Sequence, residues 1–367
     1  MNFAAIILAA GYSSRIGGFK PLMELGGQSL LGRSIALFRQ AGIARISVVT
    51  GHRHTEVKAE AARFGISCIH NLDYSRGMYA SVCAAVSHLS GIDGFFLLPV
   101  DIPLIRPATI EALIAAFVGQ AVVYPCFNGL RGHPPLIPAM FIPAILGHSG
   151  EGGLKALLEE KNHLDIAVWD QSILFDADTP NDFAMLGLRL ARMTIGTPAE
   201  ALALATLTMP ERGVAHGLAV ALVAKQLTEE LNCHGYNLDL DLVNNGALLH
   251  DIAKGQPQHE IRGGQILHRL GLPQLAEIVA AHRDISPPLP EHLTEKEVVY
   301  LADKLVRGTL RVSVQQRFAE KLELYAESQE TCRAINSRLA NALAVQSLVE
   351  AALGTSIEEF LDGEQCK

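Results

Sequence analysis

A small-residue loop with two basic side chains is the clearest candidate for chemistry in this sequence. Residues 8–20 read LAAGYSSRIGGFK and follow an apolar run, residues 3–8, that is typical of a buried strand. Small residues leaving a strand let several backbone N–H groups approach one anion, because no bulky side chain intervenes. Arg15 and Lys20 would add two positive charges. The loop therefore predicts triphosphate binding, although it matches neither GxxxxGK[ST] nor GxGxxG, and an ordinary strand–loop–helix corner is the alternative.

Two carboxylates are candidates for holding a cation beside that loop. Asp101 follows an apolar stretch, and Asp178 lies in the sequence DADTPND of residues 176–182. Magnesium prefers carboxylate oxygens next to nucleotide phosphates, so we expect Asp101, which follows a strand at the same sheet edge as the loop, to bind Mg²⁺. The alternative for the second carboxylate is local structure, with Asp178 or Thr179 capping a helix whose first residue is Pro180.

A second set of candidate ligands lies in the other half of the chain. His216, the adjacent pair His250 and Asp251, and Asp303 fall on three separate stretches of helical periodicity. Neighbours on a helix point about 100° apart, so the adjacent pair could share one metal only at a helix end. Burying this polar pair after an apolar run would be costly without a cation. Imidazole with carboxylate suits Mn²⁺, Fe²⁺ or Zn²⁺.

The elements that must position these residues differ between the two halves. Strand patterns at 3–8, 45–50, 67–71, 95–99 and 121–125 alternate with helical patterns at 30–40, 55–64, 79–89 and 108–117. This alternation predicts an α/β, doubly wound, mostly parallel sheet, whose ligands bind beyond the carboxyl ends of the strands. We expect this domain to span residues 1–193.

From about residue 197 to 367 the pattern predicts an all-α domain. Helical periodicity covers 214–231, 242–253, 261–270, 275–282, 295–307, 314–324 and 332–353. Residues 193–198 form a short connection with glycine and proline, and residues 284–290 are predicted to be a rigid loop.

Five segments of the first half together resemble one family of enzymes, the molybdenum-cofactor cytidylyltransferases among the nucleotidyltransferases that activate a phosphorylated acceptor. Residues 8–20 resemble the signature LAAGxSxRMGxxK, and Asn71 with RGMYAS (76–81) resembles N…GMxxS. RGHP (131–134) has a direct counterpart, GEGGLK (150–155) stands where the family has GDxGAR, and DADTPND resembles DxDTPxD. The resemblance implies a nucleotide-diphospho-sugar transferase-like fold.

The resemblance also implies roles for individual residues. Nucleotide contacts are expected from Leu8, Ala9, Ala10, Gly11, Ser13, Ser14, Arg15, Lys20, Asn71, Gly77, Ser81 and Asp101. Acceptor contacts are expected from Arg131, Gly132, His133 and Lys155. The metal role of Asp178, with Asp176 as a further candidate, is implied by the family resemblance of its segment. The implied reaction transfers CMP from CTP to molybdenum cofactor and releases pyrophosphate. Arg15 and Lys20 would stabilise the leaving group, while Mg²⁺ on Asp101 and Asp178 would bridge the α-phosphate and the nucleophile.

The second half resembles the HD phosphohydrolase superfamily in the order of His216, His250-Asp251 and Asp303, across roughly residues 197–310. These four would be the metal ligands, and His259 and His282 lie where some members hold a second metal. The implied reaction is attack of metal-activated water on a phosphate ester or anhydride, with Lys254 neutralising the substrate phosphate. Other proteins with this fold act as sensors or regulatory modules.

Composition excludes several other classes of protein. The net charge of −8 argues against general nucleic-acid binding, and no apolar run reaches the roughly 18 to 20 residues of a membrane span. The chain opens into a predicted strand without a basic segment, so no signal peptide is expected. Six scattered cysteines without a CxxC pair predict free thiols in a cytoplasmic protein.

Two alternatives stay open at this point. The acceptor could be a sugar or polyol phosphate, because no residue chemistry considered above selects molybdenum cofactor or the cytosine base. The second half could be a non-catalytic module that controls the transferase. A molybdoenzyme or its chaperone is an expected partner only through the family resemblance.

Overall fold

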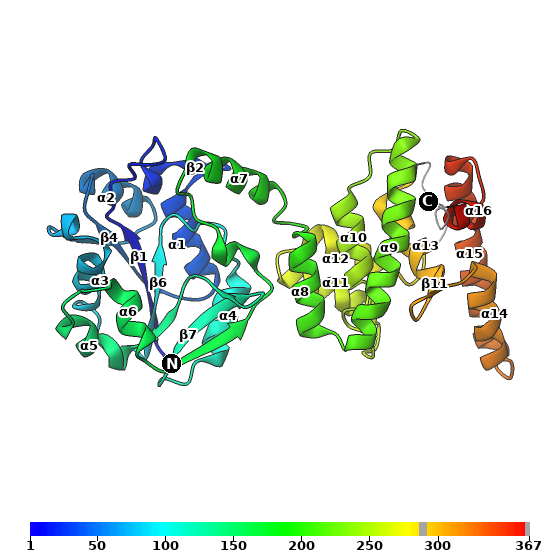
Figure 1. Cartoon of the computed structure of the whole chain (residues 1–367). Helices are drawn as coiled ribbons and strands as arrows, with labels where there is room; N and C mark the ends of the chain where they lie inside the picture. The colour runs from blue at the N-terminus through cyan, green and yellow to red at the C-terminus, as the bar shows by residue number, and fades with distance from the viewer. Residues whose placement is uncertain (286–291, 364–367) are drawn as a thin grey trace. The chain divides into compact units, whose positions relative to one another are not determined.

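The structure, a computed structural model, describes residues 1–285 and 292–363. The chain divides into two compact units, Met1–Ala191 and Arg192–Lys367 (Figure 1). Most of the loop predicted at residues 284–290 lies outside the described residues. Among the described residues, no helix is both long and apolar enough to cross a bilayer.

A single eight-stranded sheet forms the centre of the first unit. Its order is β10-β7-β9-β6-β1-β4-β5, with β8 paired to β7. The pairs of β1 with β4 and β6, of β4 with β5 and of β7 with β10 are parallel, whereas β8 and β9 run antiparallel to their neighbours. The predicted mostly parallel sheet is therefore confirmed. The strands are β1 (Phe3–Ala9), β4 (Arg45–Thr50), β5 (Cys68–His70), β6 (Gly94–Pro99), β7 (Val122–Phe127), β8 (Leu130–Arg131), β9 (Leu136–Pro138) and β10 (His163–Ala167).

Helices cover both faces of this sheet because its central strands are apolar on both sides. Phe95 packs in one core cluster with Val82 of α3, whereas the ring of Phe96 lies 5.6 Å from that of Phe38 in α1. Helices α1 and α4 contact each other on one face, and α3 contacts α5 and α6 on the other (Figure 1). The helices are α1 (Leu30–Gln40), α2 (His54–Arg63), α3 (Met78–Val86), α4 (Pro107–Ala116), α5 (Ile142–Gly147), α6 (Gly153–Glu159) and α7 (Pro180–Ala191).

The strand order creates a crevice beside β1. The chain moves from β1 to β4 and β5 on one side, and then returns to place β6 on the other side. The loops that leave β1 and β6 therefore separate in opposite directions at the carboxyl edge, which is where ligands bind in such sheets. Residues 10–20 follow β1 and Asp101 follows β6, so both predicted parts of the nucleotide site lie at this crevice.

The second unit is helical, as predicted, with one small exception. Strands β11 (Val306–Arg307) and β12 (Leu310–Arg311) form an antiparallel hairpin, so the prediction of helix to residue 307 was wrong. Gly308 takes a φ of 61° in the turn, which residues with a side chain rarely adopt. The helices are α8 (Pro198–Thr208), α9 (Glu211–Cys233), α10 (Leu240–Leu249), α11 (His259–Arg269), α12 (Pro273–Ala281), α13 (Glu295–Lys304), α14 (Val314–Leu324), α15 (Gln329–Leu353) and α16 (Ile357–Gly363).

Helix α10 ends earlier than its periodicity predicts. The predicted helix ran to residue 253, but α10 ends at Leu249 and His250 is its C-cap. The following residues form tight turns, in which the backbone N–H of Lys254 donates to the carbonyl of Asp251 at 2.8 Å. The apolar residues Ile252 and Ala253 lie in these turns and are buried. Because buried apolar residues continue the pattern of the helix before them, the sequence resembled a longer helix.

Candidate nucleotide site and candidate metal centre

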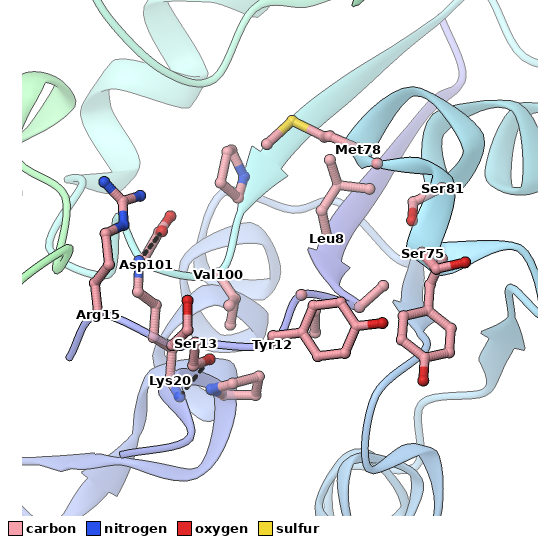
Figure 2. Close-up of a pocket in the computed structure, with 18 residues that line it drawn as sticks. Leu8, Tyr12, Ser13, Arg15, Lys20, Ser75, Met78, Ser81, Val100 and Asp101 are labelled. Carbon is pink, nitrogen blue, oxygen red and sulfur yellow. Dashed lines mark hydrogen bonds and ion pairs between the residues drawn. The ribbon is translucent and has the colours of Figure 1, made fainter. Parts of the chain in front are cut away.

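The loop after β1 forms one wall of a pocket of about 450 Å³. Ser13 has a φ of 58°, and its hydroxyl accepts a hydrogen bond of 3.0 Å from the backbone N–H of Lys20, which holds the loop closed. Basic and acidic side chains gather at one end of the pocket, and Leu8, Met78 and Ser81 lie at the other (Figure 2). The predicted residues that line it are Leu8, Ala9, Ala10, Gly11, Ser13, Ser14, Arg15, Lys20, Gly77, Ser81 and Asp101.

Lys20 connects the two predicted magnesium ligands. Its Nζ lies 2.8 Å from Oδ2 of Asp101 and 2.6 Å from Oδ1 of Asp178. Arg15 reaches the other oxygen of Asp178 at 2.8 Å. Burial works against the charge of Lys20, but the two carboxylates raise its pKa above the usual value. Lys20 in turn holds the pKa of Asp178 below its usual value.

These carboxylates suit a hard divalent cation. Both carboxylates converge on the single ammonium group of Lys20. Their ligand atoms are all oxygens, which Mg²⁺ prefers. Burial raises the pKa of the Asp176 carboxyl, and the nearby charges of Asp178 and Asp101 raise it further. The two segments are tied by a backbone hydrogen bond of 2.9 Å from Ala177 N–H to the carbonyl of Asp101.

The cap of α7 resolves the alternative reading of Asp178. The hydroxyl of Thr179 accepts from the N–H of Asp182, and the carboxylate of Asp182 accepts from the N–H of Thr179 at 2.8 Å. Thr179 therefore caps the helix, which leaves both oxygens of Asp178 to Arg15 and Lys20.

Asn71 and Ser81 form a buried pair at the uncharged end of the pocket. The amide of Asn71 donates to the hydroxyl of Ser81 at 3.0 Å, so the hydroxyl proton of Ser81 is left to donate elsewhere. Ser81 lines the pocket directly, whereas Asn71 lies behind it.

The predicted acceptor residues are not brought together in this pocket. Arg131 forms a bidentate pair with Asp165, at 2.7 and 3.0 Å, and its guanidinium lies over the ring of Tyr124. The side chain of Lys155 is 87% exposed and lies 3.7 Å from Glu159.

Gly132 and His133 belong to the packing beneath the site. A Cβ on Gly132 would lie 2.5 Å from the carbonyl of Ile173, and the N–H of His133 donates to that carbonyl. Burial lowers the pKa of the His133 imidazole, while the nearby charge of Asp101 acts in the opposite direction.

Seven lining residues were not among the predicted nucleotide contacts, namely Tyr12, Pro21, Tyr74, Ser75, Met78, Pro99 and Val100. Tyr12 and Tyr74 lie side by side, with ring centroids 5.4 Å apart. A Cβ on Gly51 would lie 2.5 Å from the side chain of Tyr74, so this glycine makes room for it. Tyr74 and Ser75 precede the recognised segment at 76–81, but neither residue type carries a signal without the fold.

The second unit brings together the metal ligands that were predicted for its half of the chain. Nε2 of His250 lies 3.4 Å from Oδ2 of Asp251 and 3.6 Å from Oδ1 of Asp303, and Nε2 of His216 lies 3.5 Å from the same oxygen of Asp303. One ligand atom each of His216, His250 and Asp251 lie within 4.8 Å of one another. His250 is the C-cap of α10 and keeps helical backbone angles, so the adjacent pair approaches one centre from neighbouring directions at the helix end.

A second group of ligands shares Asp251 with the first. Its Oδ1 lies 3.6 Å from Nε2 of His259 and 3.8 Å from Nε2 of His282, and these three residues also form a group within 4.8 Å. Asp251 thus faces one histidine group through each carboxylate oxygen.

The imidazoles are oriented for metal binding by their backbone contacts. Nδ1 contacts the carbonyl of Gly308 in His216, of Ala247 in His250 and of Val279 in His282, at 2.8, 2.7 and 2.6 Å. An Nδ1–H donor leaves Nε2 with a lone pair for a metal. Nε2 of His250 is buried and has no hydrogen-bond partner, so the residues present fit a divalent transition metal.

Charge in this centre also favours a cation. Burial disfavours ionisation of Asp303, but Lys304, His216 and His250 hold its pKa well below the usual value. Burial lowers the pKa of His282 to about 4. Lys254 pairs with Asp251, while its side chain remains 64% exposed.

Comparison with known proteins agrees with this division. Residues 5–166 match the family described as MobA-like NTP transferase domain, and residues 213–308 match the HD domain. The molybdenum cofactor cytidylyltransferase of Escherichia coli is 32% identical over 179 residues, covering 48% of this chain and 92% of the relative. The bifunctional protein GlmU of Geobacter sulfurreducens is 31% identical over 136 residues, covering 36% of this chain and 29% of the relative.

Solved structures with a similar fold include a nucleotidyl transferase from Methanothermobacter thermautotroptrophicus. It has a TM-score of 0.48 and 21% identity, covering 52% of this chain and 98% of its own. Molybdopterin-guanine dinucleotide biosynthesis protein A from Archaeoglobus fulgidus has a TM-score of 0.42 and 19% identity, covering 52% of this chain and all of its own.

This chain has the fold and pocket of a nucleotidyltransferase. A helical domain with a histidine–aspartate centre follows. The chain belongs to the MobA-like NTP transferase family, and it carries an HD domain after the transferase domain.

Proposed function

We propose that the first domain, residues 1–193, transfers CMP from CTP to molybdenum cofactor and releases pyrophosphate. The observation that carries this proposal is the convergence of Lys20, Arg15 and Asp101 at one end of a pocket of about 450 Å³, where Asp178 pairs with both basic side chains. The similarity to a molybdenum cofactor cytidylyltransferase supports the choice of CTP and acceptor.

The chain's own residues would act by positioning and by neutralising charge. Asp101 and Asp178 would hold Mg²⁺, which when bound supplies charge neutralisation to the phosphates. Lys20 would then leave the carboxylates for the phosphate oxygens beside Arg15. The acceptor phosphate is already ionised near neutral pH, so no side chain is needed as a general base.

The assay that tests this proposal measures pyrophosphate released from each of the four nucleoside triphosphates, with and without molybdenum cofactor. Release that requires CTP and the cofactor together supports it. A preference for GTP, or release driven by a sugar or polyol phosphate, overturns it. A molybdoenzyme or its chaperone would be the expected recipient of the product.

We infer that the second domain, residues 197–367, is a metal-dependent phosphohydrolase. His216, His250, Asp251 and Asp303 would hold a divalent transition metal such as Mn²⁺, Fe²⁺ or Zn²⁺, and His259 and His282 with Asp251 would hold a second one. A bound metal of this kind supplies Lewis acidity. Lys254 is exposed enough to exchange Asp251 for a substrate phosphate.

An Asp303→Ala variant separates two catalysts from one regulated catalyst. If phosphate release is lost while nucleotidyl transfer is unchanged, the two domains catalyse separate reactions. If only nucleotidyl transfer changes, the HD domain is a regulatory module and the phosphohydrolase proposal is wrong.

The cytoplasmic location stays a prediction. The five described cysteines, Cys68, Cys83, Cys126, Cys233 and Cys332, are free thiols, which is compatible with it.

A further inference from the structure

Helix α14 lies outside the part of the chain that matches the HD domain, yet it reaches the candidate metal centre. The match ends at residue 308, and α14 begins at Val314. Nη2 of Arg317 lies 3.1 Å from Oδ1 of Asp303, the oxygen that faces His216 and His250. Among the described residues, the only other lysine or arginine paired with Asp303 is Lys304, which contacts the opposite oxygen at 2.7 Å.

Arg317 is held in this place from two directions. Its Nη1 donates to the carbonyl of Val306 in β11, and its side chain is only 15% exposed. The guanidinium therefore joins the strand that follows α13 to the carboxylate that α13 presents. A planar fork of donors can make both contacts at once, which the single ammonium of a lysine cannot do with the same geometry.

Local helix stability does not explain a cation here. Ser313 and Gln316 already form a capping box at the start of α14. Arg317 follows directly, near the positive end of the helix dipole, where a positive charge is unfavourable. Its Nε is buried without a hydrogen-bond partner, a further cost of burial. The gain that offsets these costs lies at Asp303 and Val306.

We propose that Arg317 is a positioning residue of the metal centre, which makes α14 a working part of the HD domain. It holds Oδ1 of Asp303 toward Nε2 of His216 and His250, so that the carboxylate is already oriented when a metal binds. A carboxylate oxygen has two lone pairs, so it can accept from Arg317 and bind a metal together. This inference rests on the proposed metal centre.

The test measures Mn²⁺ affinity of the full chain by calorimetry, without nucleotide. The binding that disappears in a His250→Ala variant identifies the HD centre. Arg317→Ala should weaken that binding roughly 10- to 100-fold, the usual effect of removing a residue that orients a metal ligand. Arg317→Lys keeps the charge without the fork and should give an intermediate loss, and this variant also serves if Arg317→Ala folds poorly.

Arg311 provides a matched control for simple loosening of the C-terminal helices. Its Nη1 ties β12 to α16 through the carbonyl of Leu361 at 2.7 Å. Arg311→Ala should leave Mn²⁺ affinity within about twofold of the original. An equal loss in Arg311→Ala and Arg317→Ala overturns the inference, as does unchanged affinity in a folded Arg317→Ala chain. If no Mn²⁺ binding depends on His250, both the metal centre and this inference fail.

Discussion

Lys20 lies where a divalent cation would be expected to compete with it. Its ammonium group bridges Asp101 and Asp178, so it partly neutralises both carboxylates when no ligand is bound. A metal and a nucleotide must therefore displace one set of ion pairs while forming another. Lysine suits this exchange because its ammonium is a compact charge on a flexible stem.

Replacing Lys20 should change metal binding and catalysis in opposite directions. In Lys20→Met, the carboxylates lose their ammonium partner, so Mn²⁺ should bind the nucleotide-free pocket more tightly. Pyrophosphate release should fall by roughly 10²- to 10³-fold, since a donor to the transferred phosphates is lost. Calorimetry and a pyrophosphate assay measure the two effects.

Lys58→Met is the control for Lys20→Met, because Lys58 is exposed on α2 and does not line the pocket. It should leave Mn²⁺ binding and pyrophosphate release unchanged. Weaker Mn²⁺ binding in Lys20→Met would contradict the idea that the ammonium competes with a metal.

Metal loading should stabilise the second domain. A metal that binds only the folded state adds roughly 2.7 kcal/mol at a concentration of 100 times its Kd. Thermal unfolding followed with Mn²⁺ and with a chelator should therefore show a higher midpoint with Mn²⁺. His250→Ala should abolish the shift, while His234→Ala, on an exposed residue at the end of α9, should retain it. A shift that persists in His250→Ala would place the metal elsewhere.

At the scale of secondary-structure elements, close packing of two helices positions the metal ligands of the HD domain. A Cβ on Gly217 in α9 would lie 2.3 Å from the carbonyl of Leu248 in α10. This contact brings His216, the preceding residue, against the end of α10, where His250 and Asp251 lie. The absence of a side chain at Gly217 thus sets the spacing between two ligand-bearing helices.

Gly217→Ala should destabilise the second domain by about 1–3 kcal/mol, because the added methyl forces α9 and α10 apart. Gly213→Ala is the matched control one turn earlier, where the nearest atom to an added Cβ is 3.5 Å away. That change should be neutral or slightly stabilising, since alanine favours helix. Urea unfolding of both variants measures the difference, and equal stabilities would contradict the packing argument.

At the scale of the whole molecule, the segment that connects the two units, residues 192–196, makes its contacts with the helical unit. Arg192 pairs with Asp239 and Asp241, at 2.7 and 3.0 Å through Nη2. The amide of Asn245 donates to the carbonyls of Ile195 and Gly196, at 3.0 and 3.1 Å. The boundaries predicted at 193 and 197 stay predictions about independent folding.

A fragment of residues 192–367 should therefore unfold at a higher temperature than one of residues 197–367. The shorter fragment loses the Arg192 ion pairs and leaves the buried amide of Asn245 without its acceptors, which costs about 1–3 kcal/mol. Thermal unfolding by circular dichroism compares the two. If the midpoints agree, residues 192–196 are a free linker. Arg192→Ala in the longer fragment separates the ion pairs from the amide contacts.

Local chemistry made much of this protein predictable. The strand at 45–50 and the helices at 30–40 and 314–324 have the predicted bounds, because each has regular periodicity and a clear start or stop. The candidate ligands were found mainly from the order of the motifs and their family resemblance, and the cost of burying a polar pair such as His250 and Asp251 supported them. The unpredicted turn after Leu249 shows the limit, because buried residues in a turn imitate helical spacing.

Residue types and their order determined the two domain classes and the candidate ligands, because periodicity and charge are local properties of a chain. Only the tertiary structure decided that Lys20 faces both carboxylates, that Arg131 turns to Asp165 and that Arg317 reaches Asp303. Each of these contacts joins residues 14 to 158 positions apart. Their partners are chosen by strand order and helix packing, which no local pattern encodes.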